Sequence, residues 1–131
     1  MIVVDSSALF AITNHEPERQ RFLEILAGSD RLVMSAVSLL EIRMVTFGRF
    51  GAVGLDRLSA LFETMNLEIM PFGEAQANAA FAAFVIYGKG VHAKARLNMG
   101  DCASYALAKS LNAPLLFKGE DFAATDVVPA V

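Results

Sequence analysis

The sequence predicts an α/β fold in which a mainly parallel central sheet of four or five strands is covered by helices on both faces. Short β-branched and apolar runs recur along the chain, and segments with helical spacing of apolar residues separate them. Strands that alternate with helices are typical of parallel sheets in a three-layer α/β/α arrangement. The 131 residues suit a single domain over 1–131, because domain lengths cluster near roughly 100–150 residues.

The predicted strands are short runs that end at turn-forming residues or at acids. The first run ends at Asp5, Pro71 marks the end of the third, and the fourth precedes Gly-Glu-Asp-Phe. The four runs are 1–5, 31–35, 67–72 and 114–118, and a short fifth strand is predicted at 125–130.

Helices are predicted between these strands from the 3.6-residue spacing of apolar side chains. Pro17 suits the first position of one helix, and the glycines of 48–54 interrupt another pattern. The segment 74–87 is almost uniformly apolar, so we expect it to be buried on several sides or to form an oligomer interface. The expected helices are 6–12, 17–27, 36–47, 55–65, 74–87 and a last one that starts near 101.

Composition excludes some classes of protein. The longest apolar run, 79–87, is far shorter than the ~20 residues of a membrane span, and the N-terminus lacks the basic start of a signal peptide. Cys102 is the only cysteine, so no intramolecular disulfide can form and a reducing cytoplasm is expected. The net charge of −3 does not exclude a polyanionic substrate, because four basic or imidazole side chains cluster within 89–96 without an acid.

Four acids are candidates for a site, and the predicted topology brings three of them to one edge of the sheet by chain order alone, whereas it places Asp101 less directly. Asp5 ends the first strand, Glu41 lies in the helix after the second, and Asp121 follows the fourth. Asp101 opens the helix that leads into the fourth strand. Open α/β sheets bind ligands at the carboxyl ends of their strands, so these acids are candidates for one site.

Each acid also has a structural interpretation. Asp5 and Asp101 could cap the helices that follow them, a role worth ~1 kcal/mol. Asp121 could be a turn residue. Glu41 could form a salt bridge, with Arg96 or Arg43 as the donor.

Glu41 is the acid for which burial is most strongly expected. Its neighbours three and four positions along a helix are apolar: Val37, Met44 and Val45. A carboxylate on such a face must be paired or metal-bound. Two carboxylates ~4 Å apart repel by about 4 kcal/mol at an effective dielectric constant of 20, so gathered acids either take up protons or attract a divalent cation. Oxygen ligands without a His/Cys cluster favour Mg²⁺ or Mn²⁺ over Zn²⁺.

Four stretches of the sequence, in this order, resemble the PIN domain, specifically the VapC-like toxin ribonucleases of type II toxin–antitoxin systems. The stretches are VVDSSALFAI, SAVSLLEIRMV, RLNMGDCASYALAK and LLFKGEDF. The resemblance spans the chain and implies a single PIN domain that hydrolyses RNA phosphodiester bonds through a metal-activated water. The alternative is a non-catalytic PIN-like module that binds nucleic acid or a protein partner.

The resemblance also implies roles for individual residues. The acidic positions of the family, which bind Mg²⁺ or Mn²⁺ and activate water, correspond to Asp5, Glu41, Asp101 and Asp121, with Asp5 and Asp101 most directly at the metal. Ser7 matches a hydroxyl that supports the metal site, and Asn98 matches a polar position that orients the third acid. Glu120 departs from the pattern, because the family has Asn in the corresponding Gly-Asn-Asp-Phe motif.

The expected partners are an RNA substrate, a VapB-like antitoxin and a second copy of the chain. Lys89, Lys94 and Arg96 are candidates for RNA phosphate contacts, with a solvated loop as the alternative. His92 is a conceivable proton donor, although a lone loop histidine usually has no such role. Cys102 is expected to be a packing residue rather than a nucleophile.

Overall fold

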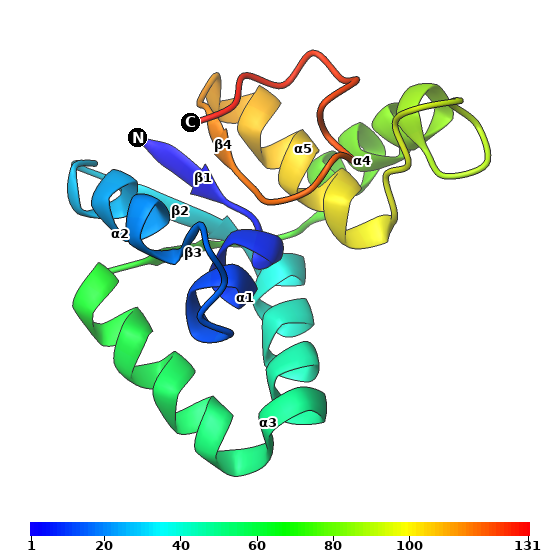
Figure 1. Cartoon of the computed structure of the whole chain (residues 1–131). Coiled ribbons are helices and arrows are strands. Elements are labelled where there is room, and N and C mark those ends of the chain that lie inside the picture. Colours follow the sequence, from blue (N-terminus) through cyan, green and yellow to red (C-terminus); the bar gives the residue numbers. More distant parts are fainter.

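The computed structural model describes all residues, 1–131, and contains four parallel strands in the order β3-β2-β1-β4. The first strand is therefore internal, with β2 on one side and β4, the last strand, on the other (Figure 1). The strands are β1 (Ile2–Val4), β2 (Leu32–Ser35), β3 (Glu68–Met70) and β4 (Leu115–Leu116). The helices are α1 (Ser6–Thr13), α2 (Arg19–Ala27), α3 (Ala36–Met65), α4 (Glu74–Tyr87) and α5 (Met99–Leu111).

Helices cover both faces of the sheet, as the sequence predicts. Successive strand residues point to opposite faces, so Val3 packs in a core with α4 and α5 while Val4 packs in a second core with α1, α2 and α3. Figure 1 shows the two helical layers on either side of the strands. The two cores make the fold a three-layer α/β/α sandwich.

The segment 125–130, predicted as a short fifth strand, does not form a strand, so the sheet has the smaller of the two expected strand numbers. Residues near the C-terminus make one isolated bridge, Leu115 with Pro129, in which the Leu115 amide donates to Val128 and the Ala130 amide donates to Leu115. Proline has no N–H and cannot continue a ladder of hydrogen bonds. The sheet therefore has four strands.

The predicted interruption of the helix at 48–54 is a kink within α3. Gly51 has φ 66° and ψ −154°, a conformation essentially restricted to glycine, and the helix resumes on its other side. The two arms of α3 meet at an angle at the lower edge of the molecule in Figure 1. Further upstream, Pro17 precedes α2 rather than opening it, because Glu18 is the N-cap residue.

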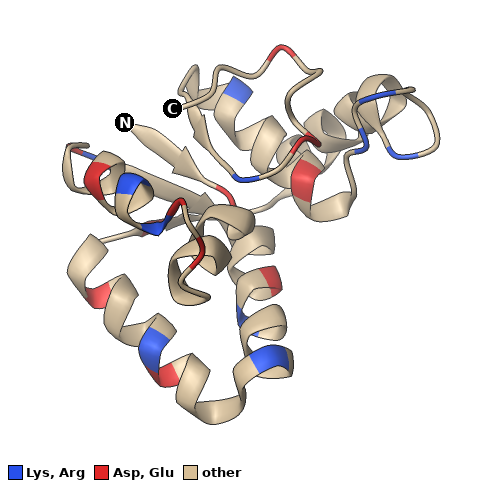
Figure 2. Ribbon diagram, in the orientation of Figure 1, with Lys and Arg blue, Asp and Glu red and all other residues tan.

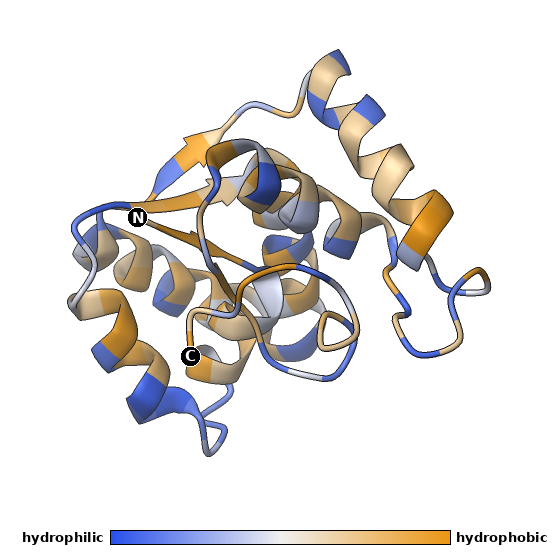
Figure 3. Cartoon of the chain, turned by 90° about the horizontal axis from the view of Figure 1, so that it is seen from above, coloured by the Kyte–Doolittle hydropathy of each residue, from blue (hydrophilic) through white to orange (hydrophobic).

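The helix α4 is not buried on several sides, contrary to one of the two expectations from its composition. Only Ala80 and Ala83 are buried, and they face α5. Phe81, Val85 and Ile86 are exposed by 67%, 55% and 58%. Figure 3 shows α4 on the outside of the molecule, with its most hydrophobic segment at its C-terminal end. None of the helices combines the length and apolar character that crossing a membrane requires.

Candidate active site

Asp5 lies at the carboxyl end of β1 and is also the N-cap of α1. Its side chain is only 1% exposed, and three protein donors satisfy it. The Ser7 amide and hydroxyl donate to Oδ2 at 3.0 and 2.6 Å, and the Ser104 hydroxyl donates to Oδ1 at 2.5 Å. Hydrogen bonds to a carboxylate favour its charged form. The cap and the site interpretations of Asp5 are therefore compatible.

Glu41 lies on the first arm of α3 and accepts a hydrogen bond from the Ser6 hydroxyl. Its pKa is raised by burial and by the charge of Asp5, although the Ser6 hydrogen bond opposes the shift. It forms no salt bridge with Arg43 or Arg96, so the ion-pair alternative is wrong.

The reason for the partial burial of Glu41 differs from the expected one. Met44 and Val45 on the same helix are exposed by 65% and 45%, so the stripe is not a core face. The carboxylate is instead covered by α5, where Gly100 lies directly against it, and by Ser6 of α1. Contacts between distant elements, rather than helix periodicity, bury this acid.

Asp101 is the third residue of α5 and forms a capping box with Asn98, the N-cap. The Asn98 side chain accepts from the Asp101 amide at 2.9 Å, and the Asp101 carboxylate accepts from the Asn98 amide at 3.1 Å. Asp101 is thus not itself the cap. Asn98 orients it, as the resemblance implies.

Burial raises the pKa of Asp101 to about 7, with smaller contributions from the charges of Asp5, Asp121 and Glu41, against the opposing hydrogen bond from Asn98. The charges of the other three predicted acids therefore all act on Asp101. The topology explains why: α5 leads into β4, so its first turn lies at the same sheet edge as the carboxyl ends of β1 and β2. Figure 2 shows acidic segments of several elements around the end of β1.

Asp121 and Glu120 are exposed and lie in the turn after β4. The start of this turn is fixed by Lys118, whose amide donates to the Ser7 hydroxyl at 3.0 Å. The Lys118 ammonium pairs with Glu16 and, at 3.0 Å, with Glu18. Lys118 therefore connects the segment that carries Asp121 to the segment after α1.

The four carboxylates are near one another without forming a closed ligand set. No three of the Asp, Glu, His or Cys side chains converge closely enough to hold a metal ion together. The donor chemistry nonetheless suits a hard divalent cation, because all the candidate ligands are carboxylate oxygens. The pKa of Asp101 is raised mainly by burial and further by the neighbouring acids, and a bound cation would oppose both effects.

The basic residues after α4 occupy exposed positions of the loop between α4 and α5. Lys89, Lys94 and Arg96 all point into solvent. His92 organises this loop, since its Nδ1 accepts from the Lys94 and Ala95 amides at 3.0 and 2.9 Å. The loop is thus a defined, basic projection beside α5.

Several residues of the site were missed from the sequence. Ser6 touches Glu41, Ser104 touches Asp5, and Gly100 provides space for Glu41. A signal existed for Ser104: it lies one helical turn after Asp101 and therefore on the same face of α5. No local pattern distinguishes Ser6 from Ser7 as the partner of Glu41.

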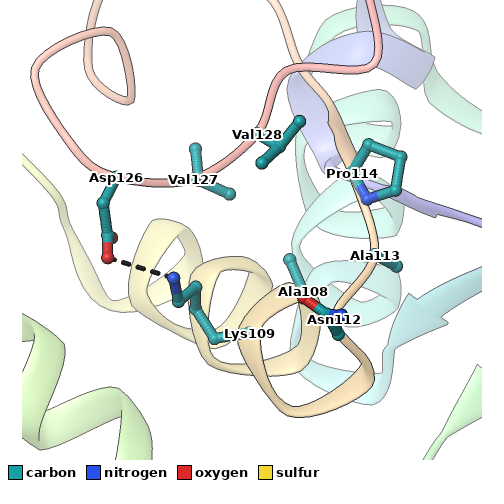
Figure 4. A pocket seen from close by; sticks show the side chains of 8 residues that line it. All are labelled: Ala108, Lys109, Asn112, Ala113, Pro114, Asp126, Val127 and Val128. Atoms are coloured by element: carbon teal, nitrogen blue, oxygen red, sulfur yellow. Dashed lines mark hydrogen bonds and ion pairs between the residues drawn. The ribbon is translucent and has the colours of Figure 1, made fainter.

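Two other features lie outside this site. Cys102 is buried, and burial together with Asp101 raises its pKa to about 11, which fits a packing residue and not a nucleophile. A pocket of about 130 Å³ lies at the opposite end of α5, where Lys109 and Asp126 form an ion pair of 3.0 Å (Figure 4). None of the predicted site residues lines this pocket.

Fold and site together define a class: parallel α/β/α proteins with an acidic centre at the carboxyl edge of the sheet. A family model described as PIN domain matches residues 2–128. The chain belongs to the PIN domain family.

Two similar proteins are named as VapC ribonucleases. Ribonuclease VapC30 of Mycobacterium tuberculosis is 43% identical over 126 residues, which cover 96% of this chain and 95% of that protein. Ribonuclease VapC of Mycolicibacterium smegmatis is also 43% identical over 126 residues, covering 96% and 97%. The chain is thus similar to VapC ribonucleases over nearly its whole length.

Solved structures share the fold at low sequence identity. VapC20 of Mycobacterium tuberculosis, described as a Sarcin-Ricin loop cleaving toxin, has a TM-score of 0.80 at 18% identity and covers 98% of this chain and 97% of its own. VapBC2 from Rickettsia felis, bound to a DNA fragment from their promoter, has a TM-score of 0.73 at 19% identity, with 98% and 96% covered. These likenesses support the architecture.

Proposed function

We propose that this chain is a metal-dependent endoribonuclease, the toxin of a toxin–antitoxin pair, which works as a single PIN domain over 1–131. The observation that carries the proposal is the electrostatic coupling of Asp101 to Asp5, Glu41 and Asp121, acids that come from four separate segments. The relatives named as VapC ribonucleases at 43% identity support the same reaction class.

Asp5 and Asp101 are the residues that would hold the cation, with Mg²⁺ or Mn²⁺ as the expected metal. A divalent cation bound by carboxylates lowers the pKa of a coordinated water and stabilises charge on a phosphate. Asp5 is held in place by Ser7, and Asn98 fixes the orientation of Asp101. Both carboxylates are therefore oriented before any ligand arrives.

Glu41 and Asp121 are proposed to handle the attacking water. A carboxylate with a raised pKa is a better proton acceptor, and the pKa of Glu41 is raised by its burial. Hydrolysis joins the water oxygen to phosphorus and breaks the bond to the 3′ oxygen; the acids accept the proton that the water loses, and the 3′ oxygen takes up a proton from solvent to become a hydroxyl. Exposed Asp121 lies on the solvent side, where the substrate must enter.

Lys89, Lys94 and Arg96 are proposed to contact RNA phosphates, because their exposed loop lies beside the helix that carries Asp101. A VapB-like antitoxin and a second copy of the chain are the proposed protein partners. The toxin–antitoxin complexes among the structures with this fold support the first, and the exposed apolar residues of α4 support the second. RNA as substrate and a single reduced cysteine favour the cytoplasm.

Cleavage of total RNA by the purified chain tests this proposal. We expect fragments with Mg²⁺ or Mn²⁺, none after chelation with EDTA, and at least a 100-fold lower rate for Asp5→Asn or Asp101→Asn. Lys109→Gln, which alters a surface pair at the other end of α5, is the matched control. A protein that shows neither cleavage nor stabilisation by Mn²⁺ would instead be the non-catalytic module.

A further inference from the structure

Two buried serines form a hydrogen-bonded chain that ends on Asp5. The Ser38 and Ser104 hydroxyl oxygens are 2.9 Å apart, and the Ser104 oxygen is 2.5 Å from Asp5 Oδ1. Ser38 and Ser104 are both 0% exposed, so no bulk water reaches either hydroxyl. Buried hydroxyls are costly unless they are hydrogen-bonded, which makes this contact more than incidental packing.

The hydrogen bonds of these three residues can run in only one direction from donor to acceptor. An ionised carboxylate only accepts hydrogen bonds, so the single proton of Ser104 points to Asp5. Ser104 has no second proton to give, and Ser38 must therefore donate to Ser104. The order of donation is Ser38 to Ser104 to Asp5.

The same three residues belong to the three elements that carry the innermost acids. Ser38 lies three positions before Glu41 on α3, and Ser104 lies three positions after Asp101 on α5. Residues three apart in a helix share one face, so each serine lies one turn along its helix from an acid of the site. The serines therefore tie α3, α5 and the end of β1 together directly beneath the carboxylates.

We propose that Ser38 and Ser104 are positioning residues that set the orientation of Asp5 and the spacing of α3 and α5 for divalent-cation binding. Ser104 is the only partner of Asp5 Oδ1, whereas Oδ2 is held by Ser7. Without the Ser104 hydroxyl, Oδ1 has no donor and the carboxylate is fixed at one oxygen only. This inference rests on the proposed function, because it concerns the cation that Asp5 would hold.

The test measures Mn²⁺ affinity by calorimetry or by electron paramagnetic resonance, independently of RNA cleavage. Loss of a residue that orients a metal ligand typically weakens affinity about 10–100-fold, and we expect a loss in this range for Ser104→Ala. We expect a smaller loss for Ser38→Ala. Because Ser38 acts only through Ser104, the double variant should bind Mn²⁺ as Ser104→Ala does, without a further decrease.

A pair of isosteric variants separates the hydroxyl from packing. Ser104→Thr keeps the hydroxyl donor, and Ser104→Val replaces the hydroxyl with a methyl group of the same size. The Ser104→Thr protein should therefore bind Mn²⁺ at least 5-fold more tightly than the Ser104→Val protein. In cleavage assays, the Mn²⁺ concentration for half-maximal rate should rise in Ser104→Ala while KM for RNA stays unchanged. Ser110→Ala, an exposed serine on the same helix, is the control and should match the wild type.

Wild-type Mn²⁺ affinity in Ser104→Ala would overturn the inference, as would equal affinities of Thr and Val or fully additive losses in the double variant. If Asp5→Asn loses Mn²⁺ binding and Ser104→Ala does not, only the positioning role fails. If the wild type itself binds no Mn²⁺, the proposed function fails and this inference falls with it. Thermal unfolding of each variant confirms that it is folded.

Discussion

Gly100 of α5 lies directly against the carboxylate of Glu41 on α3, and a β-carbon at position 100 would overlap the carboxylate oxygens. An added methyl group would push the Glu41 carboxylate aside, because the backbone of α5 approaches the end of this side chain. The contact joins residues 59 positions apart in the chain. It also explains how Glu41 is partly buried although Met44 and Val45 on the same helix are exposed.

Gly100→Ala should displace the Glu41 carboxylate and lower the rate of RNA cleavage by about tenfold or more, since a misplaced catalytic group is costly. Because the atoms that alanine would meet are the end of a flexible side chain, the free energy of unfolding, measured with denaturant, should change little. Gly48→Ala is the control, because nothing lies near position 48 and alanine favours a helix. Equal activity of the two variants would contradict the role assigned to Gly100.

Asp101 should make the stability of the metal-free protein depend on pH. Its pKa is about 7 in the folded protein, above the usual value of 3.8, so folding favours its protonated form. The resulting stabilisation is complete below pH ~4 and is lost as the pH rises through 7. Asp101→Asn, which cannot ionise, should therefore match the wild type at pH 4 and exceed its melting temperature at pH 8.

The difference in melting temperature between Asp101→Asn and the wild type isolates this group from all others that titrate. Each kcal/mol corresponds to about 4 °C for a chain of this size. Mn²⁺ should reverse the order at pH 8 by stabilising only the wild type. If the difference in melting temperature did not depend on pH, the pKa of Asp101 would not be raised in the folded protein.

Phe81→Glu should shift the chain toward the monomer. Phe81 is exposed by 67% on α4, beside Val85 and Ile86, and a charge there opposes burial against a second copy. Light scattering during size-exclusion chromatography measures the mass of the particle. Val53→Glu, an equally exposed apolar position on α3, is the control. An unchanged mass for Phe81→Glu would place any self-association elsewhere.

The basic loop after α4 should contribute affinity for RNA without sequence preference. Each of Lys89→Ala, Lys94→Ala and Arg96→Ala should reduce the slope of log affinity against log salt by about 1 if the side chain contacts a phosphate. Binding to a labelled RNA by Asp101→Asn, across salt concentrations, gives this slope without cleavage. Lys109→Ala, in the pair with Asp126, should leave it unchanged.

Much of the architecture is predictable from the sequence because its strands end at visible signals. Asp5 directly follows β1, and Pro71 directly follows β3. Asp5, Glu41 and Asp121 could be assigned to one sheet edge from chain order alone, since parallel strands have their carboxyl ends together. The placement of Asp101 needed one further argument, because a helix that leads into a parallel strand begins at this same edge of the sheet.

What the sequence could not predict depends on contacts between distant segments. Helical spacing placed Glu41 on an apolar stripe, but the stripe faces solvent and the carboxylate is covered by residues of α1 and α5. The apolar composition of α4 indicated burial, yet only part of the helix packs inward, including Phe84 and Tyr87, while Phe81, Val85 and Ile86 remain exposed. Gly51 lets two predicted helices continue as one kinked element.

The strand order has a consequence for synthesis of the protein. The internal strand β1 is made before its partner β4, because more than 100 residues separate the two strands in the chain. Asp5 likewise depends on Ser104 and, through Ser7, on Lys118. A nascent chain that has not reached these residues lacks the surroundings of its first acid. The acidic centre therefore cannot be assembled before Lys118 has been made.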